Sequence, residues 1–185
     1  MTLDTERLRL RPWTEEDAQD CYEYARDPSV GPIAGWPPHV SVENSRTIIR
    51  DILVRPENYA IVWKESGQVI GAIGLMFGSE TTLTDRSDEC ELGYWLGASF
   101  WGRGIMTEAA KEVLRHAFED LGVRKVWCGY FDGNARSVRV QEKLGFTFCK
   151  TERSMYVAQM KEYRMCHITC LSEDAWKYQA SVERV

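Results

Sequence analysis

Two glycines, Gly102 and Gly104, flank Arg103 and lead directly into the most strongly patterned stretch of this sequence. Apolar residues then recur at spacings of three and four, with charged residues between them, which predicts an amphipathic helix of about four turns. Gly122 follows this stretch and predicts a left-handed helix end. The chain must therefore bury one face of a helix that begins at a glycine turn. The apolar positions are Met106, Ala110, Val113, Leu114, Ala117 and Leu121.

The start of this helix has free backbone N–H groups and the positive end of the helix dipole. Glycines allow another group to approach the main chain closely, so the turn suits an anion. The same glycines could equally serve only to turn the chain from a strand into a helix. A P-loop is excluded because G-x-x-x-x-G-K-[ST] is absent, and G-x-G lacks the third glycine of a dinucleotide fingerprint.

Length and charge narrow the class of protein. With 185 residues and 44% hydrophobic content, we expect one domain over residues 1–185 with a substantial core. The formal charge of -5 argues against a nucleic-acid partner. The opening residues lack the apolar segment of a signal peptide, and no run approaches the ~18 apolar residues of a membrane span. We therefore expect a cytoplasmic protein without a membrane partner, either a monomer or a homodimer.

The six cysteines show no C-x-x-C spacing, and we expect them to be free thiols. The sequence around Cys166, His167 and Cys170 is the one place that suggests a metal. In a strand the two cysteines point to one side and His167 to the other, which cannot make a compact site. We expect no metal.

The order of predicted elements indicates an α+β (α/β) fold. A parallel pair of strands should flank the central helix in a twisted, mixed but mostly antiparallel sheet, with helices on both faces. Residues 35–39 should form a rigid aromatic loop. The predicted strands are residues 6–13, 59–64, 68–77, 89–96, 125–131, 146–156 and 162–171; the predicted helices are residues 14–27, 41–53, 105–121 and 134–144, with a last capped turn at 172–176.

Residues 91–96, residues 101–109 and residues 134–146, in this order and spacing, closely resemble the GNAT superfamily of acetyl-CoA-dependent N-acetyltransferases. Residues 5–13 and 35–38 resemble its RimJ/RimL branch. The resemblance spans about residues 5–176. It implies one GNAT-like domain that binds acetyl-CoA as acetyl donor and needs no metal.

The resemblance assigns the glycine turn to the pyrophosphate of acetyl-CoA. The family pattern Q/R-x-x-G-x-G/A falls on residues 101–106, with Trp101 in place of Gln or Arg and Met106 in place of Gly or Ala. Backbone N–H groups can bind phosphate whatever the side chains are. Arg103 could pair with a phosphate or lie solvated on the rim, and the same two readings apply to Lys143. The implied phosphate-binding residues are Trp101, Gly102, Arg103, Gly104, Ile105, Met106 and Thr107.

The resemblance also implies that the pantetheine arm pairs with the backbone of Tyr94, Trp95 and Leu96, opposite residues 125–131. A bulge at Gly93 would suit the required separation of the two strands. Asn134 could contact the pantetheine, or it could simply cap the helix that follows it.

The implied reaction is direct attack of a primary amine on the acetyl thioester in a ternary complex. Glu91 matches the carboxylate that removes the amine proton, acting through water, but Glu89 lies on the same strand face and the sequence does not separate them. Ser137 is expected to protonate the leaving thiolate. Trp36 is expected to form a wall of the acceptor site, where Glu89 would also lie.

Three alternatives remain open at this stage. The acceptor could be the α-amine of a peptide or protein, whose pKa of ~7.7–8.0 makes it easier to deprotonate than a lysine amine at ~10.4. It could instead be a small-molecule amine such as a polyamine or an aminoglycoside. The chain could also be a catalytically silent module that binds or senses acyl-CoA.

Overall fold

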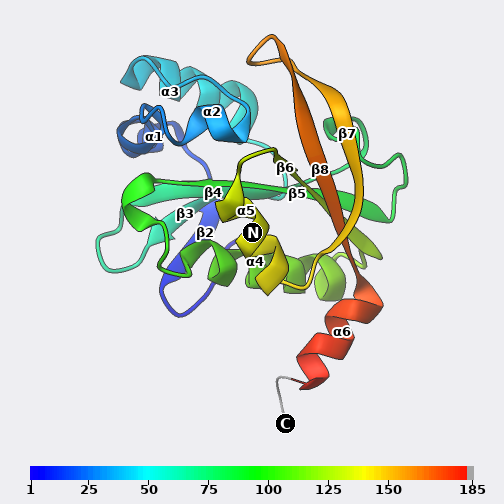
Figure 1. Cartoon of the computed structure of the whole chain (residues 1–185). Helices are drawn as coiled ribbons and strands as arrows, with labels where there is room; N and C mark the ends of the chain where they lie inside the picture. Colours follow the sequence, from blue (N-terminus) through cyan, green and yellow to red (C-terminus); the bar gives the residue numbers. More distant parts are fainter. Residues whose placement is uncertain (183–185) are drawn as a thin grey trace.

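The computed structural model describes residues 1–182, and these form a mixed sheet with helices on both of its faces (Figure 1). The strand order is β1-β2-β3-β4-β5-β6-β8-β7. Neighbouring strands are antiparallel, with the exception of β5 and β6, which are parallel. The expected α+β fold is thus confirmed. The strands are β1 Leu3–Asp4, β2 Leu8–Pro12, β3 Asn58–Trp63, β4 Val69–Met76, β5 Glu89–Leu96, β6 Lys125–Phe131, β7 Thr147–Val157 and β8 Glu162–Ser172.

Two groups of helices cover the two faces of the sheet. Figure 1 shows α1, α2 and α3 on one side and α4 on the other. The side chains agree, because Ala18, Cys21 and Ile49 join one buried cluster while Ala110 and Leu114 join a second one. The helices are α1 Ala18–Ala25, α2 Gly31–Ala34, α3 Val42–Ile48, α4 Ile105–Arg115, α5 Ala135–Lys143 and α6 Glu173–Val182; α3 and α4 continue as π-helical turns, Ile49–Leu53 and His116–Asp120.

The parallel strands β5 and β6 pair along only part of their length. They pair from Glu89↔Lys125 to Glu91↔Trp127 and then separate. The predicted bulge at Gly93 is wrong, since β5 keeps an unbroken register with β4 from Glu91 to Leu96. β5 instead stays paired with β4, and β6 stays paired with β8. Because each of these pairs twists, β5 and β6 move apart beyond Glu91 and Trp127.

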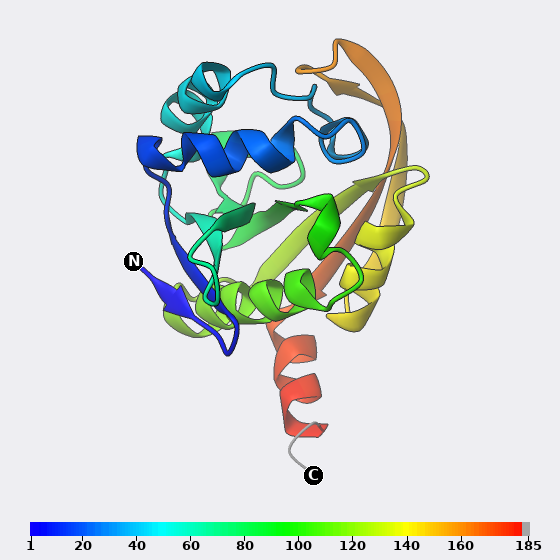
Figure 2. The same ribbon diagram turned by 90° about the vertical axis from the view of Figure 1, so that its left-hand side faces the viewer.

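Three elements differ from the sequence-based expectations. Residues 31–34, for which no helix is predicted, form the short helix α2, because proline is compatible with the first turn of a helix. Gly35, with φ of 97°, ends it. The expected final turn is the full helix α6, which packs Trp176 against Phe118 and then projects away from the sheet (Figures 1 and 2). The short strand β1 was not predicted.

All six cysteines are free thiols, as expected. Cys149 lies at a register shift of β7, and its Sγ is 3.0 Å from the Sγ of Cys170 on β8. Within residues 1–182, no three His, Cys, Asp or Glu side chains gather where they could hold a metal ion. None of the helices in that range is long and apolar enough to cross a membrane.

Candidate active site

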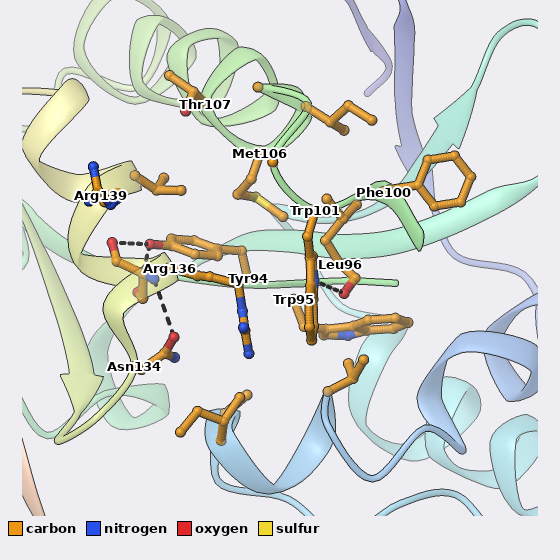
Figure 3. Close-up of a pocket in the computed structure, with 18 of the residues that line it drawn as sticks. Tyr94, Trp95, Leu96, Phe100, Trp101, Met106, Thr107, Asn134, Arg136 and Arg139 are labelled. Carbon is orange, nitrogen blue, oxygen red and sulfur yellow. Dashed lines mark hydrogen bonds between the residues drawn. The ribbon is translucent and has the colours of Figure 1, made fainter. Parts of the chain in front are cut away.

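A cavity of about 200 Å³ opens between the end of β5, the start of α4 and one face of α5 (Figure 3). We call it the α4–α5 cavity. Thr107 and Met106 face it from α4, while Asn134, Arg136 and Arg139 face it from the α5 side. Its lining comprises Val30, Ile33, Ala34, Tyr94, Trp95, Leu96, Phe100, Trp101, Gly102, Gly104, Ile105, Met106, Thr107, Asn134, Arg136, Ser137, Arg139, Val140 and Lys143.

The glycine turn at the start of α4 has the backbone conformation that the sequence suggests. Gly102 and Gly104 have φ of 72° and 74°, a region that other residues rarely adopt. No atom lies within 3.4 Å of a Cβ built at either position, so the conformation rather than crowding requires glycine. Gly104 precedes the first helical residue, and the first-turn N–H groups of α4 are therefore available beside the cavity. This geometry suits an anionic ligand.

Positive charge at this cavity comes from α5. Arg136, Arg139 and Lys143 line the cavity from one face of the helix, and the Arg136 guanidinium lies 3.7 Å from the centroid of the Trp101 ring. Sequence reasoning singled out Lys143 but missed the two arginines. The available signal was the spacing of three between Arg136 and Arg139 and of four between Arg139 and Lys143, because residues so spaced share a helix face.

The side chains of Arg103 and Trp101 have structural partners. Arg103 lies over the rings of Trp63 and Phe100, at 5.1 and 5.4 Å from their centroids, instead of lining the cavity. Trp101 Nε1 donates a 2.8 Å hydrogen bond to the carbonyl of Leu96. Trp101 therefore ties the glycine turn to the end of β5 and forms a flat wall of the cavity.

A second cavity, of about 250 Å³, fills the gap where β5 and β6 separate. We call it the β5–β6 cavity. It shares Ile33, Ala34, Tyr94, Asn134 and Ser137 with the α4–α5 cavity, so these residues mark the junction of the two. Its other lining residues are Met76, Thr82, Leu83, Glu91, Leu92, Gly93, Cys128, Gly129, Tyr130, Phe131, Met155 and Cys166.

The structure separates the two glutamates of β5. Glu91 lines the β5–β6 cavity and accepts a 2.5 Å hydrogen bond from the Thr81 hydroxyl. Burial raises the pKa of Glu91, although the Thr81 hydrogen bond and the positive charge of Arg55 both act against this rise. Its carboxyl is therefore poised to accept a proton.

Glu89, by contrast, is buried in a local network at the start of β5. It accepts hydrogen bonds from Trp127 Nε1 at 2.6 Å and from Thr84 at 2.8 Å. It also forms ion pairs with Arg86 at 3.2 Å and Lys125 at 3.8 Å. These contacts occupy the carboxylate and give Glu89 a structural role.

Ser137 lies at the junction of the two cavities, between the side chains of Tyr94 and Gln141. Its Oγ is 2.9 Å from the Tyr94 hydroxyl and accepts a 3.0 Å hydrogen bond from Gln141 Nε2. The other end of the Gln141 amide accepts from Thr169, at 2.7 Å, which fixes the orientation of the amide. When the Tyr94 hydroxyl is the donor of this pair, the Ser137 hydrogen is free to point into either cavity. Asn134 caps α5 by accepting from the backbone N–H of Ser137 at 3.2 Å.

Trp36 is a third predicted site residue, after Arg103 and Glu89, that lines neither cavity. Its ring packs against Trp95 and His39, with centroids 5.6 and 5.4 Å apart. Ile33 and Ala34 of α2 line both cavities, at the wall that Trp36 was expected to form. The remaining predicted residues, apart from Arg103 and Glu89 as described above, line one cavity or both.

The separated parallel strands and the glycine turn at the start of α4 agree with what comparisons with known proteins find. Residues 7–147 match the family model described as the acetyltransferase (GNAT) domain. This chain belongs to the GNAT acetyltransferase family. It is thus an acyltransferase of a family whose members use acetyl-CoA as co-substrate.

Relatives of known name agree with this assignment. The chain is 29% identical over 150 residues to the uncharacterized N-acetyltransferase p20 of Bacillus licheniformis, covering 78% of this chain and 82% of that protein. A GNAT-family acetyltransferase from Bacillus anthracis has the same fold, with a TM-score of 0.81 and 18% identity over 94% of this chain and 99% of the other. The ribosomal-protein-S5-alanine acetyltransferase of Vibrio fischeri superimposes with a TM-score of 0.70 and 18% identity over 95% and 98% of the two chains. The last two likenesses concern the fold.

Proposed function

We propose that this GNAT protein transfers the acetyl group of acetyl-CoA to a primary amine, with Glu91 as base and Ser137 as proton donor. The observation that carries this proposal is the junction of the two cavities. There Ser137 borders both spaces, and Glu91 lines the space beyond it. A donor bound on one side and an amine bound on the other would meet beside these two groups.

The α4–α5 cavity fits acetyl-CoA. Backbone N–H groups of residues 102–107 would bind its phosphates, and Arg136, Arg139 and Lys143 would supply positive charge. The backbone of residues 94–96 would pair with the pantetheine arm in the gap left by β6, with Asn134 beside it. When bound, acetyl-CoA supplies an acetyl group activated as a thioester.

The two named residues manage the protons of the transfer. Glu91 takes a proton from the amine, directly or through water, because a neutral amine is the nucleophile. The amine nitrogen then bonds to the carbonyl carbon as the carbon–sulfur bond breaks. Ser137 gives its proton to the departing sulfur. The proton that the nitrogen still has to lose returns to Ser137 through water or through the Tyr94 hydroxyl, which is 2.9 Å away. The products are an acetylated amine and a free thiol.

We further propose that the acceptor is the α-amine of a peptide or protein N-terminus, in the manner of the RimJ/RimL branch. An α-amine needs less help from a single carboxylate than a lysine amine does. The fold likeness to an acetyltransferase named for a ribosomal protein supports a protein as the acceptor.

Thiol release from acetyl-CoA, measured with short peptides and with an amine panel, tests this function. Mass spectrometry of the products should place the acetyl group on the peptide α-amine. Peptides blocked at the N-terminus but carrying lysine are the matched control and should react far more slowly. A protein that binds acetyl-CoA yet acetylates no amine would be a silent binding module instead.

A further inference from the structure

The β5–β6 cavity has a lining that restricts its acceptor further. Apolar side chains form about half of its wall, with Met76, Leu83, Leu92, Phe131 and Met155 contributed by four strands and one loop. The polar groups among its lining residues are mostly neutral hydroxyls, thiols and an amide. The acceptor would thus meet uncharged side chains around a single carboxylate, that of Glu91.

Glu91 is the one Asp, Glu, Lys, Arg or His among the residues that line this cavity. Other charged side chains lie nearby but outside the cavity. Arg55, whose positive charge acts on Glu91, is 3.8 Å from Glu80. Arg164 lies over the Phe131 ring at 5.4 Å while it pairs with Glu162 and the Pro32 carbonyl, and Asp132 pairs with His167 at 3.1 Å. None of these groups lines the cavity, so its lining residues offer one anionic side chain and no cationic one.

We propose that this chain selects acceptors with a single amine charge and an uncharged substituent. This inference rests on the proposed function and narrows its substrate class. A polyamine or an aminoglycoside would bring at least a second ammonium group into the cavity, where no second carboxylate is present to pair with it. Burying an unpaired charge is costly, so these amines should react poorly.

The same reasoning applies to the carboxylate of a free amino acid. That group would lie close to Glu91, which has the same charge, and no lining residue could neutralise it. An amide or a peptide bond in its place removes the charge. A peptide N-terminus with an uncharged first residue carries one amine charge and no carboxylate near it. A simple arylalkyl amine does so too.

A panel of matched amines tests the selectivity. Leucine amide, a Leu-initiated peptide and 2-phenylethylamine should each show a kcat/KM at least about 100-fold above those of lysine amide, putrescine, spermidine and kanamycin. Free leucine should fall below leucine amide by a similar factor. Comparison of kcat/KM for the peptide and for 2-phenylethylamine tells whether a peptide α-amine or a small arylalkyl amine is the preferred acceptor.

A second carboxylate in the cavity should relax this selectivity. Leu83 is half-buried in the loop before β5, where a polar side chain can be accommodated. Leu83→Glu should raise the kcat/KM for putrescine relative to that for 2-phenylethylamine by about tenfold, as expected for one added ion pair. The isosteric Leu83→Gln controls for the change of shape and should not raise this ratio.

The outcomes separate the two proposals. Equal or better turnover of putrescine, spermidine or kanamycin by the unmodified protein would overturn the selectivity and leave the acetyltransferase function in place. Acetyl transfer to no amine in the panel would overturn the proposed function and the selectivity together. The same ratio for Leu83→Glu and Leu83→Gln would show that charge in the cavity does not set the preference.

Discussion

At the scale of single residues, Glu91 combines an unfavourable environment with a catalytic task. Burial raises its pKa, and the Thr81 hydroxyl and Arg55 only partly offset that effect. A raised folded pKa means that the protonated carboxyl favours the fold below the pKa of the unfolded chain. This contribution is lost as the pH rises through the folded pKa, so at neutral pH the protein holds a charge that destabilises it.

Glu91→Gln should therefore separate activity from stability. The acetylation rate at pH 7 should fall by about 10²–10⁴-fold, because the base is lost, while acetyl-CoA affinity stays unchanged. The melting temperature at pH 7 should rise, since Gln can still accept from Thr81 without the buried charge. This gain should disappear near pH 4, which calorimetry across pH would detect. A lower melting temperature at pH 7 would contradict this account.

Gln141 is a positioning residue for the proposed proton donor. It is buried, and its amide is fixed between Ser137 and Thr169. Gln141→Leu should lower kcat by about fivefold to tenfold without changing the KM for acetyl-CoA, because one hydrogen bond is worth about 1 kcal/mol.

A double-mutant cycle distinguishes positioning from general damage. If Gln141 acts through Ser137, Gln141→Leu should have little further effect on kcat in a Ser137→Ala background. Rate losses that multiply in the double variant would show that Gln141 acts independently of Ser137. Melting temperatures of all four proteins report any loss of structure separately.

At the scale of elements, Gly104 at the start of α4 has two roles: it allows the turn into the helix, and it lies where phosphate would bind. Gly104 adopts φ of 74° and leads into the helix that would bind phosphate. Gly104→Val should lower stability through backbone strain and should also weaken acetyl-CoA binding at least tenfold, measured by calorimetry. Gly67→Val is the matched control, because Gly67 has φ of 75° and open surroundings in the β3–β4 turn. It should share the loss of stability alone; equal weakening of binding by both would contradict the assignment.

The sequence predicts those elements whose causes are local. The alternation in residues 89–96 and the periodicity that ends at Gly122 identify β5 and the central helix closely. The choice between Glu89 and Glu91 could not be made, because both share a strand face and only distant partners, Trp127 and Thr81, distinguish them. Trp36 was misplaced for the same reason, since its direction depends on how α2 packs against β5.

At the scale of the whole molecule, the sheet consists of two halves that meet where β5 pairs briefly with β6. Beyond Glu91 and Trp127 the two strands separate, so backbone groups on their facing edges have no partner strand. The α4–α5 and β5–β6 cavities meet in this gap. A ligand that pairs with β5 there would complete the sheet in place of a strand.

Hydrogen exchange should reveal this completion directly. Acetyl-CoA should slow amide exchange most in residues 92–96 and at the start of α4, where its pantetheine and phosphates would lie. Amides in α1 and α3 should change only through the general stabilisation that any ligand gives, about 2.7 kcal/mol at a concentration 100 times Kd. Because Gly104→Val should weaken binding, the same acetyl-CoA concentration should protect residues 92–96 less in that variant. Protection centred on α1 and α3, with none in residues 92–96, would place the ligand elsewhere and remove the basis for bringing the thioester to Ser137.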